Sequence, residues 1–256
     1  MGKKVSGRSY YQKGDSVSHG RVDSNFRDVV RILNQQGTVF WVNEGSLLGL
    51  VRDGKLIEWD HDIDISFFSP GINLEELRDL LSRAGFKAQF SPLRRPDFPR
   101  LKLTRKCGRI VDLSIYRLRE FGGQQYWAHE WYHTDKFPPR TIKRKGALVL
   151  LRLVHRCWYS TRFGLLKTIG FPRSFEAVFR SLHSSLSISW GLEKTVGYYI
   201  DIDFLSKIVY RDYEGVACPI PLNAEGVLSR LYGNSWSIPQ RSTRWTDFMS
   251  APPNAP

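Results

Sequence analysis

The sequence predicts an α+β fold in its first half and a basic, mostly helical region in its second half. The chain has 256 residues, 41% of them hydrophobic and 25% charged, so it can bury a core without disulfide bonds. Up to about residue 125, helical apolar spacing alternates with β-branched and aromatic runs. Beyond that point, residues 140–180 carry ten Lys or Arg against one acid, while the whole chain has a net charge of +13. Such a surplus favours anionic partners.

A helix is expected first, beginning at Ser24 and ending at Gly37. Ser is a favoured N-cap residue and Gly a common stop. The apolar residues of this segment recur on one helical face; they are Phe26, Val29, Val30 and Leu33. Residues 38–42 are β-branched and aromatic, which is typical of a strand, and residues 45–52 are expected to form a short helix.

A second strand and helix follow. In residues 61–68, Asp alternates with Ile before the run turns apolar, which predicts a strand with one polar face. Asn73 is then expected to cap a helix. Three further strands are expected at 86–90, 100–104 and 109–118. Gly122-Gly123 is the expected junction between a core at 21–125 and the basic region at 126–245, with an arm at 1–20 and a tail at 246–256.

Three carboxylates stand out because they are spaced two residues apart. Asp60, Asp62 and Asp64 would lie on one face of a strand, where their like charges repel one another. A divalent cation with oxygen ligands would remove that repulsion, and Mg²⁺ (or Mn²⁺) suits such ligands. The alternative is a solvated acidic edge.

Neighbouring residues favour phosphate chemistry at these acids. Gly45 and Ser46 begin a short helix directly after a strand, and the free N–H groups of a helix N-terminus bind anions. Arg52 could add a charge-assisted contact to phosphate. Asp112 lies between apolar residues in a later strand, from which it could reach Asp62 and Asp64. A phosphate site beside a carboxylate metal site suits nucleotide phosphoryl transfer.

The run from residue 45 to residue 64 resembles the signature of the LicD family. The matching positions are Gly45, Ser46, Leu47, Leu48, Gly49, Arg52, Gly54, Trp59, Asp60, Asp62, Ile63 and Asp64. Near the end of the chain, a looser second match resembles the family's Y-E-G, P-x-P and L-x-x-x-Y-G-x-x-W elements. It consists of Tyr213, Glu214, Gly215, Pro219, Pro221, Leu228, Tyr232, Gly233 and Trp236. Together the two matches span roughly residues 24–240.

The resemblance implies a nucleotidyltransferase-type mixed β-sheet with flanking helices. It implies that Asp62, Asp64 and Asp112 bind the metal, that Gly45, Ser46 and Arg52 hold donor phosphates, and that Asp112 and Asp60 are the catalytic carboxylates. Asp112 would take the proton of the acceptor hydroxyl, and Asp60 would orient ligand or water. The implied reaction moves phosphocholine, ribitol phosphate or glycerol phosphate from a CDP-activated donor to a sugar hydroxyl of a cell-surface glycan such as lipopolysaccharide.

Two other functions stay open at the level of sequence. One is a nucleotidyltransferase that acts on RNA or a small molecule, with the basic half gripping nucleic acid. The other is an inactive module that binds a glycan or nucleic acid. The spacing of the G-S and D-x-D elements argues against the first, so nucleic acid is not the expected partner. The full set of acids argues against the second.

The termini and the basic half suggest where the chain acts. Residues 1–20 are polar and basic with no apolar stretch, so no secretory signal is expected, and a Golgi-lumenal location is not expected without a signal anchor. We expect a cytoplasmic protein that is peripheral at the inner face of a membrane, because residues 140–180 interleave cations with apolar residues. Such a surface would suit a glycolipid acceptor. The same cations could instead bind an anionic substrate.

Overall fold

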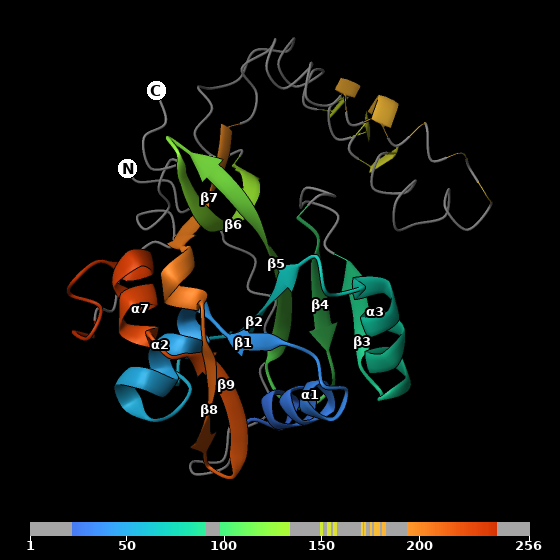
Figure 1. Ribbon diagram of the computed structural model, residues 1–256. Coiled ribbons are helices and arrows are strands. Elements are labelled where there is room, and N and C mark those ends of the chain that lie inside the picture. The colour runs from blue at the N-terminus through green and yellow to red at the C-terminus, as the bar shows by residue number, and fades with distance from the viewer. Residues whose placement is uncertain are drawn as a thin grey trace, which may run out of the picture.

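The computed structural model describes residues 22–90, 98–133 and 194–239, together with isolated residues between 149 and 182 (Figure 1). A mixed β-sheet forms the centre of the described part, and helices flank it. The strands are β1 (Phe40–Val42), β2 (Asp62–Ser69), β3 (Lys87–Phe90), β4 (Arg100–Thr104), β5 (Ile110–Phe121), β6 (Gln124–His133), β7 (Lys194–Asp201), β8 (Ile208–Tyr213) and β9 (Val216–Pro221). The helices are α1 (Ser24–Gln35), α2 (Glu44–Asp53), α3 (Leu74–Arg83), α7 (Ala224–Tyr232) and the 3₁₀ turn η1 (Ile202–Leu205).

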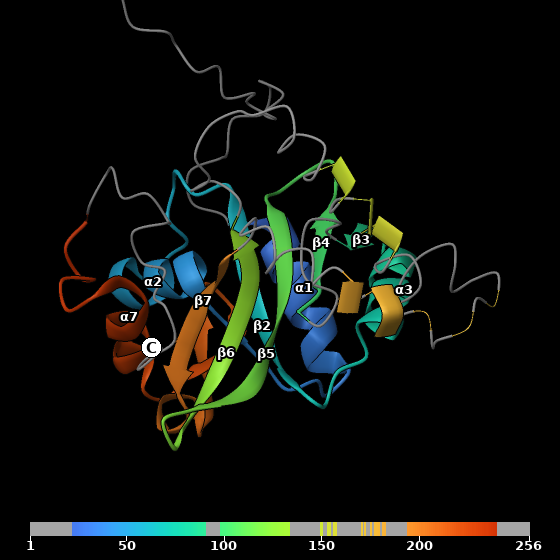
Figure 2. The same ribbon diagram turned by 90° about the horizontal axis from the view of Figure 1, so that it is seen from above.

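The long strand β5 holds the sheet together. Five strands run in the order β1-β2-β5-β4-β3, and β2 and β5 are parallel while the other neighbours are antiparallel. The far half of β5 pairs with β6, which pairs with β7, so the sheet extends away from the five-stranded part (Figure 2). The predicted mixed sheet with flanking helices is therefore confirmed.

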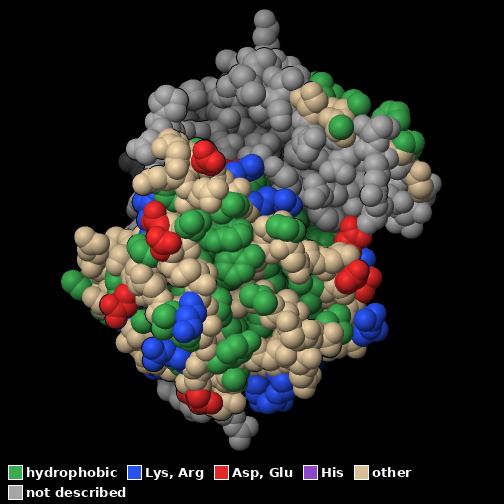
Figure 3. Space-filling view, viewed as in Figure 1, with side chains coloured by type: hydrophobic (Ala, Val, Ile, Leu, Met, Phe, Trp, Pro, Cys, Tyr) green, Lys and Arg blue, Asp and Glu red, His purple; other side chains and the backbone are tan. Residues whose placement is uncertain are grey.

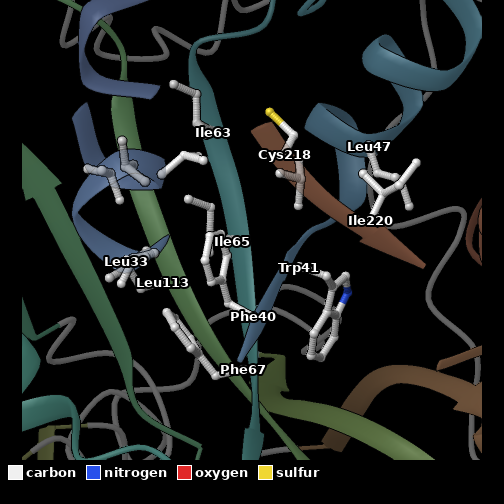
Figure 4. Close-up of a cluster of buried hydrophobic side chains, with 14 of the residues drawn as sticks. Leu33, Phe40, Trp41, Leu47, Ile63, Ile65, Phe67, Leu113, Cys218 and Ile220 are labelled. Atoms are coloured by element: carbon white, nitrogen blue, oxygen red, sulfur yellow. The ribbon is translucent and has the colours of Figure 1, made fainter. Parts of the chain in front are cut away.

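Strand alternation gives the sheet one apolar face. Ile63, Ile65 and Phe67 of β2 are fully buried, and their neighbours on β5 and β4 are also buried. Helices α1 and α3 contribute Leu33 and Leu81 to the same core. Figure 4 shows Leu33 close to Ile65 beside β2. The helical face predicted for residues 24–37 is therefore the face that α1 buries.

The opposite face of β2 and β5 is polar, and α2 begins beside it. Asn43, between β1 and α2, donates its backbone N–H to the carbonyl of Asp64 at 3.0 Å. Its side-chain amide donates to Ser66 Oγ at 3.1 Å and to Tyr116 Oη at 2.9 Å. These bonds hold the start of α2 against the polar face, which therefore has a fixed geometry.

The C-terminal segment adds a hairpin and a helix to this side of the molecule. The turn between β8 and β9 has positive φ at both Glu214 (53°) and Gly215 (80°), as a two-residue hairpin turn requires. Strand β9 contacts β1 and α1, and Asn34 Nδ2 of α1 donates to the carbonyl of Ala217 at 2.9 Å. Helix α7 then contacts α2. The C-terminal segment that carries the second match to the family therefore packs against the segment that carries the first.

Residues beyond 125 include more strand than expected where the structure describes them, while the helical character expected of the basic run at 140–180 stays a prediction because most of that run lies outside the described residues. The described residues after residue 125 form β6, β7, β8, β9 and only one continuous helix, α7. Gly122-Gly123 is the turn of the β5–β6 hairpin, so the sheet continues across the expected junction. Residues 126–133 and 194–201 adopt strands because each can pair with a neighbour along its whole length.

Other expectations fall on parts that the structure does not cover. The arm at 1–20, the tail at 246–256 and most of the basic run at 140–180 lie outside the described residues. Among the helices that are described, none has the length and apolar character needed to cross a lipid bilayer.

Candidate active site

Three carboxylates meet on the polar face of the sheet. Asp64 of β2 lies directly opposite Asp112 of the parallel strand β5, and Asp62 is two residues earlier on the same face of β2. Each of the three offers a carboxylate oxygen, and these oxygens all lie within 4.8 Å of one another. Asp64 and Asp112 are only 8% and 3% exposed, while Asp62 is half-buried. The structure therefore brings together the three acids that the sequence assigned to a metal.

Asp60 lies in the loop before β2, and its side chain lies beside the first turn of α2. The strand begins only at Asp62, so the expectation that all three acids of the D-x-D-x-D run share a strand face is wrong for Asp60. Its carboxylate lies against Gly45, where a Cβ atom would stand 2.5 Å from Asp60 Oδ2. Asp60 Oδ1 accepts the backbone N–H of His61 at 2.9 Å. A helix N-terminus attracts negative charge, so this position suits a carboxylate.

Ser46 and Arg52, both expected to hold phosphate, have other contacts in this structure. Ser46 is 2% exposed, and its Oγ accepts the backbone N–H of Asp64 at 3.0 Å. This bond joins α2 to β2 and leaves the hydroxyl proton of Ser46 available as a donor. Arg52 lies in the last turn of α2, about 9 Å of helical rise from Ser46. Its Nη2 pairs with Asp53 Oδ2 at 2.7 Å, so it is not brought to the carboxylates.

A further acid, Glu44, belongs to the cluster although the sequence analysis missed it. Glu44 is the first residue of α2 and has a φ of 47°, an uncommon conformation for a residue other than Gly. Its charge ranks directly after burial among the causes that raise the pKa of Asp64. The sequence could have indicated this residue, because Glu44 is an acid directly before Gly45 and Ser46.

Arg100 is the second residue that the sequence analysis missed. It begins β4, and its Nη1 donates to Asp112 Oδ2 at 2.8 Å. The two side chains are only 15% and 4% exposed. Burial works against the charged guanidinium, but Asp112, followed by Glu44, leaves the pKa of Arg100 raised overall. The alternation of polar and apolar residues in 100–104 could have identified Arg100, since it places Arg100 on the strand face that does not carry Leu101 and Leu103.

Lys102 provides a second cation on this face of β4. It lies opposite Asp112 in the register of β4 and β5, and its side chain is exposed. Its charge is among the causes that lower the pKa of Asp62. Lys102 is therefore an accessible cation beside the carboxylates, in contrast to Arg100.

The cations beside the carboxylates do not fully offset the repulsion between these acids. Burial raises the pKa of Asp64 well above its usual value, and Glu44 and Asp62 raise it further. Burial and the charge of Asp60 likewise raise the pKa of Asp62. Asp112 Oδ1 is buried and has no hydrogen-bond partner in the described part of the chain. Crowded carboxylates with a free buried oxygen fit a hard divalent cation.

The C-terminal helix also reaches this cluster. Tyr232 of α7 is partly buried, and burial raises the pKa of its hydroxyl well above the usual range. Tyr198, and then the charges of Glu44 and Asp64, raise this pKa further, so the hydroxyl interacts with both acids. The second family-like stretch therefore contributes to the surroundings of the carboxylates and does not form a separate site.

Comparisons with known proteins agree with this arrangement. Residues 37–148 match the family model described as LicD/FKTN/FKRP, nucleotidyltransferase domain. That range contains β1 to β6 and all five acids of the cluster. Ribitol 5-phosphate transferase FKRP of Mus musculus and that of Homo sapiens are each 42% identical to this chain over 53 residues. The stretch makes up 20% of this chain and 11% of each relative, so the match spans about a tenth of the length of these curated relatives.

Proposed function

We propose that this chain, which carries a nucleotidyltransferase domain of the LicD/FKTN/FKRP family in residues 37–148, is a phospho-alcohol transferase. It moves ribitol phosphate, glycerol phosphate or phosphocholine from a CDP-activated donor to a sugar hydroxyl of a glycan. The observation that carries the proposal is the meeting of Asp62, Asp64 and Asp112 within 4.8 Å inside the matched domain. Ribitol phosphate has the most direct support, since the curated relatives are named ribitol 5-phosphate transferases.

The carboxylates fit a divalent metal ion, which we take to be Mg²⁺ or Mn²⁺. Asp62, Asp64 and the free Oδ1 of Asp112 would hold it. When bound, such an ion supplies positive charge to the donor diphosphate and to its leaving group. The protein's own part is to hold these oxygens in place, through the bond from Asp64 N–H to Ser46 and the ion pair of Asp112 with Arg100.

Asp60 is better placed than Asp112 to accept the proton of the acceptor hydroxyl. A general base must come within hydrogen-bond distance of the hydroxyl that it deprotonates. Asp112 is 3% exposed, and its Oδ2 is already bound to Arg100. Asp60 is half-buried at the N-terminus of α2 and adjoins Asp62. We therefore propose that Asp112 is a metal ligand and that Asp60 is the general base.

Lys102 replaces Arg52 as the proposed contact to donor phosphate. Arg52 is paired with Asp53 at the far end of α2, whereas Lys102 is exposed and lies opposite Asp112 on the polar face. An ammonium group in this position attracts phosphate oxygens without needing a fixed orientation.

The test is a donor-hydrolysis and transfer assay with CDP-ribitol, CDP-glycerol and CDP-choline beside CTP and ATP. In Asp62→Asn and Asp64→Asn we expect Mg²⁺-dependent turnover to fall by more than about 10²-fold, since the loss of even an outer-shell partner costs up to about that much. The fold should persist, because replacing Asp with Asn removes repulsion between neighbouring acids.

Two further variants sharpen the assay. Asp112→Asn should weaken metal dependence and donor binding, whereas Asp60→Asn should lower kcat with donor binding largely kept. Asp79→Asn on α3, an exposed acid paired with Arg78, is the matched control and should behave as wild type. Near-normal turnover in Asp62→Asn or Asp64→Asn would refute the assignment. Turnover of CTP or ATP, but of no CDP-alcohol, would favour a nucleotidyltransferase.

A further inference from the structure

Arg100 is a cation buried inside a group of acids. It reaches Asp112 from the strand next to β5, at 2.8 Å, and its side chain is only 15% exposed. Four acids of the cluster act on its charge; in decreasing order they are Asp112, Glu44, Asp64 and Asp62. An Arg side chain stays protonated in proteins, so this position holds a permanent positive charge.

The ion pair with Arg100 occupies one carboxylate oxygen of Asp112 and leaves the other oxygen available to a metal ion. Oδ2 accepts the guanidinium of Arg100, while Oδ1 is buried without a hydrogen-bond partner among the described residues. Enzymes that use two metal ions place them about 3.5–4 Å apart, clamped by shared ligands. Asp112 has one oxygen left for a metal, so it cannot bridge two ions with one oxygen on each while the ion pair is intact.

We propose that Arg100 stands in for a second cation, so that the carboxylate cluster binds one divalent ion per chain. The inference rests on the proposed function, in which Asp62, Asp64 and Asp112 hold a metal. It goes further by assigning Arg100 as the positioning residue that sets the number of ions. Lys102 does not share this task, because its exposed ammonium is open to solvent and to the donor.

The number of bound ions can be counted without any substrate. We would titrate the full chain with Mn²⁺ alone, measure free Mn²⁺ by electron paramagnetic resonance, and confirm the stoichiometry by calorimetry. The wild type should bind one ion per chain. Arg100→Gln should bind two, because the change frees Asp112 Oδ2 and removes one positive charge. Arg100→Lys should stay at one, because it restores the charge.

A control and a second readout keep the test decisive. Arg105→Gln changes a neighbouring Arg that pairs with Asp28, outside the cluster, and should leave the count at one. The melting temperature of Arg100→Gln should be lower than that of wild type without metal, and should rise more on adding Mn²⁺. If Arg100→Gln fails to fold, the number of Mn²⁺ ions bound by the wild type still tests the proposal, because two ions per chain would overturn it.

The outcomes separate the two proposals. Two ions of similar affinity in the wild type would overturn the role of Arg100 and leave the metal-dependent function standing. An unchanged count of one in a folded Arg100→Gln would do the same. No bound Mn²⁺ in the wild type would overturn the metal assignment of the proposed function, and the inference with it.

Discussion

Gly45 and Gly49 belong to the same short motif but have different tasks. A Cβ on Gly45 would stand 2.5 Å from Asp60 Oδ2, so Gly45 makes room for a carboxylate side chain of the candidate site. A Cβ on Gly49 would stand 2.6 Å from the carbonyl oxygen of Lys55 and 2.8 Å from the N atom of Ile57. Gly49 therefore lets the chain after α2 fold back against the helix, which is a requirement of the fold and not of the chemistry.

The first position yields a prediction for catalysis. In Gly45→Ala the added methyl group should displace the carboxylate of Asp60, since that is the nearest atom and a side chain can move more easily than backbone. We expect kcat to fall by ~10²-fold, the cost of misplacing a reacting group by about 1 Å. Steady-state kinetics measures the loss, and an unchanged thermal melting curve should show that the fold is kept.

A double-mutant cycle provides the control for this prediction. If the damage acts through Asp60, adding Gly45→Ala to Asp60→Ala should cost little further activity. A full additional loss in the double variant would mean that Gly45 contacts the donor phosphates directly, as the sequence pattern predicts.

At the scale of the elements, the start of α1 shows how a side chain can join distant segments. Asp23 caps the helix, with Oδ1 accepting the N–H groups of Asn25 at 2.9 Å and Phe26 at 3.1 Å. Its Oδ2 accepts the N–H of Arg109, at 2.9 Å, next to the start of β5. The sequence pattern predicts Ser24 as the cap, whereas in the structure Ser24 is the first helical residue.

This cap can be tested by comparing neighbouring variants. Asp23→Ala should lower the free energy of unfolding by about 1–2 kcal/mol, since it removes an N-cap that also bonds to a second segment. Ser24→Ala removes only an exposed bond to the carbonyl of Cys107 and should change the free energy of unfolding by less than about 0.5 kcal/mol. Urea unfolding measures both values. A larger loss in Ser24→Ala would show that the capping assignment is wrong.

Local patterns predicted the elements of the first half and the carboxylates that they carry. Alternation put Asp62 and Asp64 on one face and Ile63 on the other, and Asp112 stood out as an acid between apolar residues of a later strand. The pairing of Arg100 with Asp112 depends on the register between β4 and β5, which no local pattern specifies. The β6–β7 pair was missed for a related reason, because residues 134–193 separate strands that become neighbours only in the folded chain.

At the scale of the whole molecule, charge and apolar surface are unevenly distributed. The chain has a net charge of +13, although its candidate site is rich in acids. Figure 3 shows apolar side chains gathered at the upper right, where Figure 1 draws the described residues between 149 and 182. The large exposed apolar residues of that segment are Val149, Leu150, Leu153, Phe175, Val178 and Leu182. Residues 140–180 of the sequence interleave ten cations with such residues.

This combination leads us to expect reversible binding to an anionic membrane. Each Lys or Arg near an anionic leaflet contributes about 1 kcal/mol, and exposed apolar side chains can insert between the headgroups. Phe175, Val178 and Leu182 recur at the spacing of one helical face and are 42%, 56% and 43% exposed. Such a surface would bring the carboxylate site to a glycan that is carried on a lipid.

Co-sedimentation with vesicles tests this expectation. The wild type should bind vesicles that contain anionic lipid, bind neutral vesicles weakly, and dissociate as salt rises, because salt screens the attraction between cations and the leaflet. Replacing Phe175, Val178 and Leu182 together with Ser should weaken binding, whereas Val39→Ser, at a 66% exposed position before β1, should not. If the wild type binds no vesicle even at low salt, the cations serve the phosphates of the donor or an anionic glycan, and the apolar residues serve another contact.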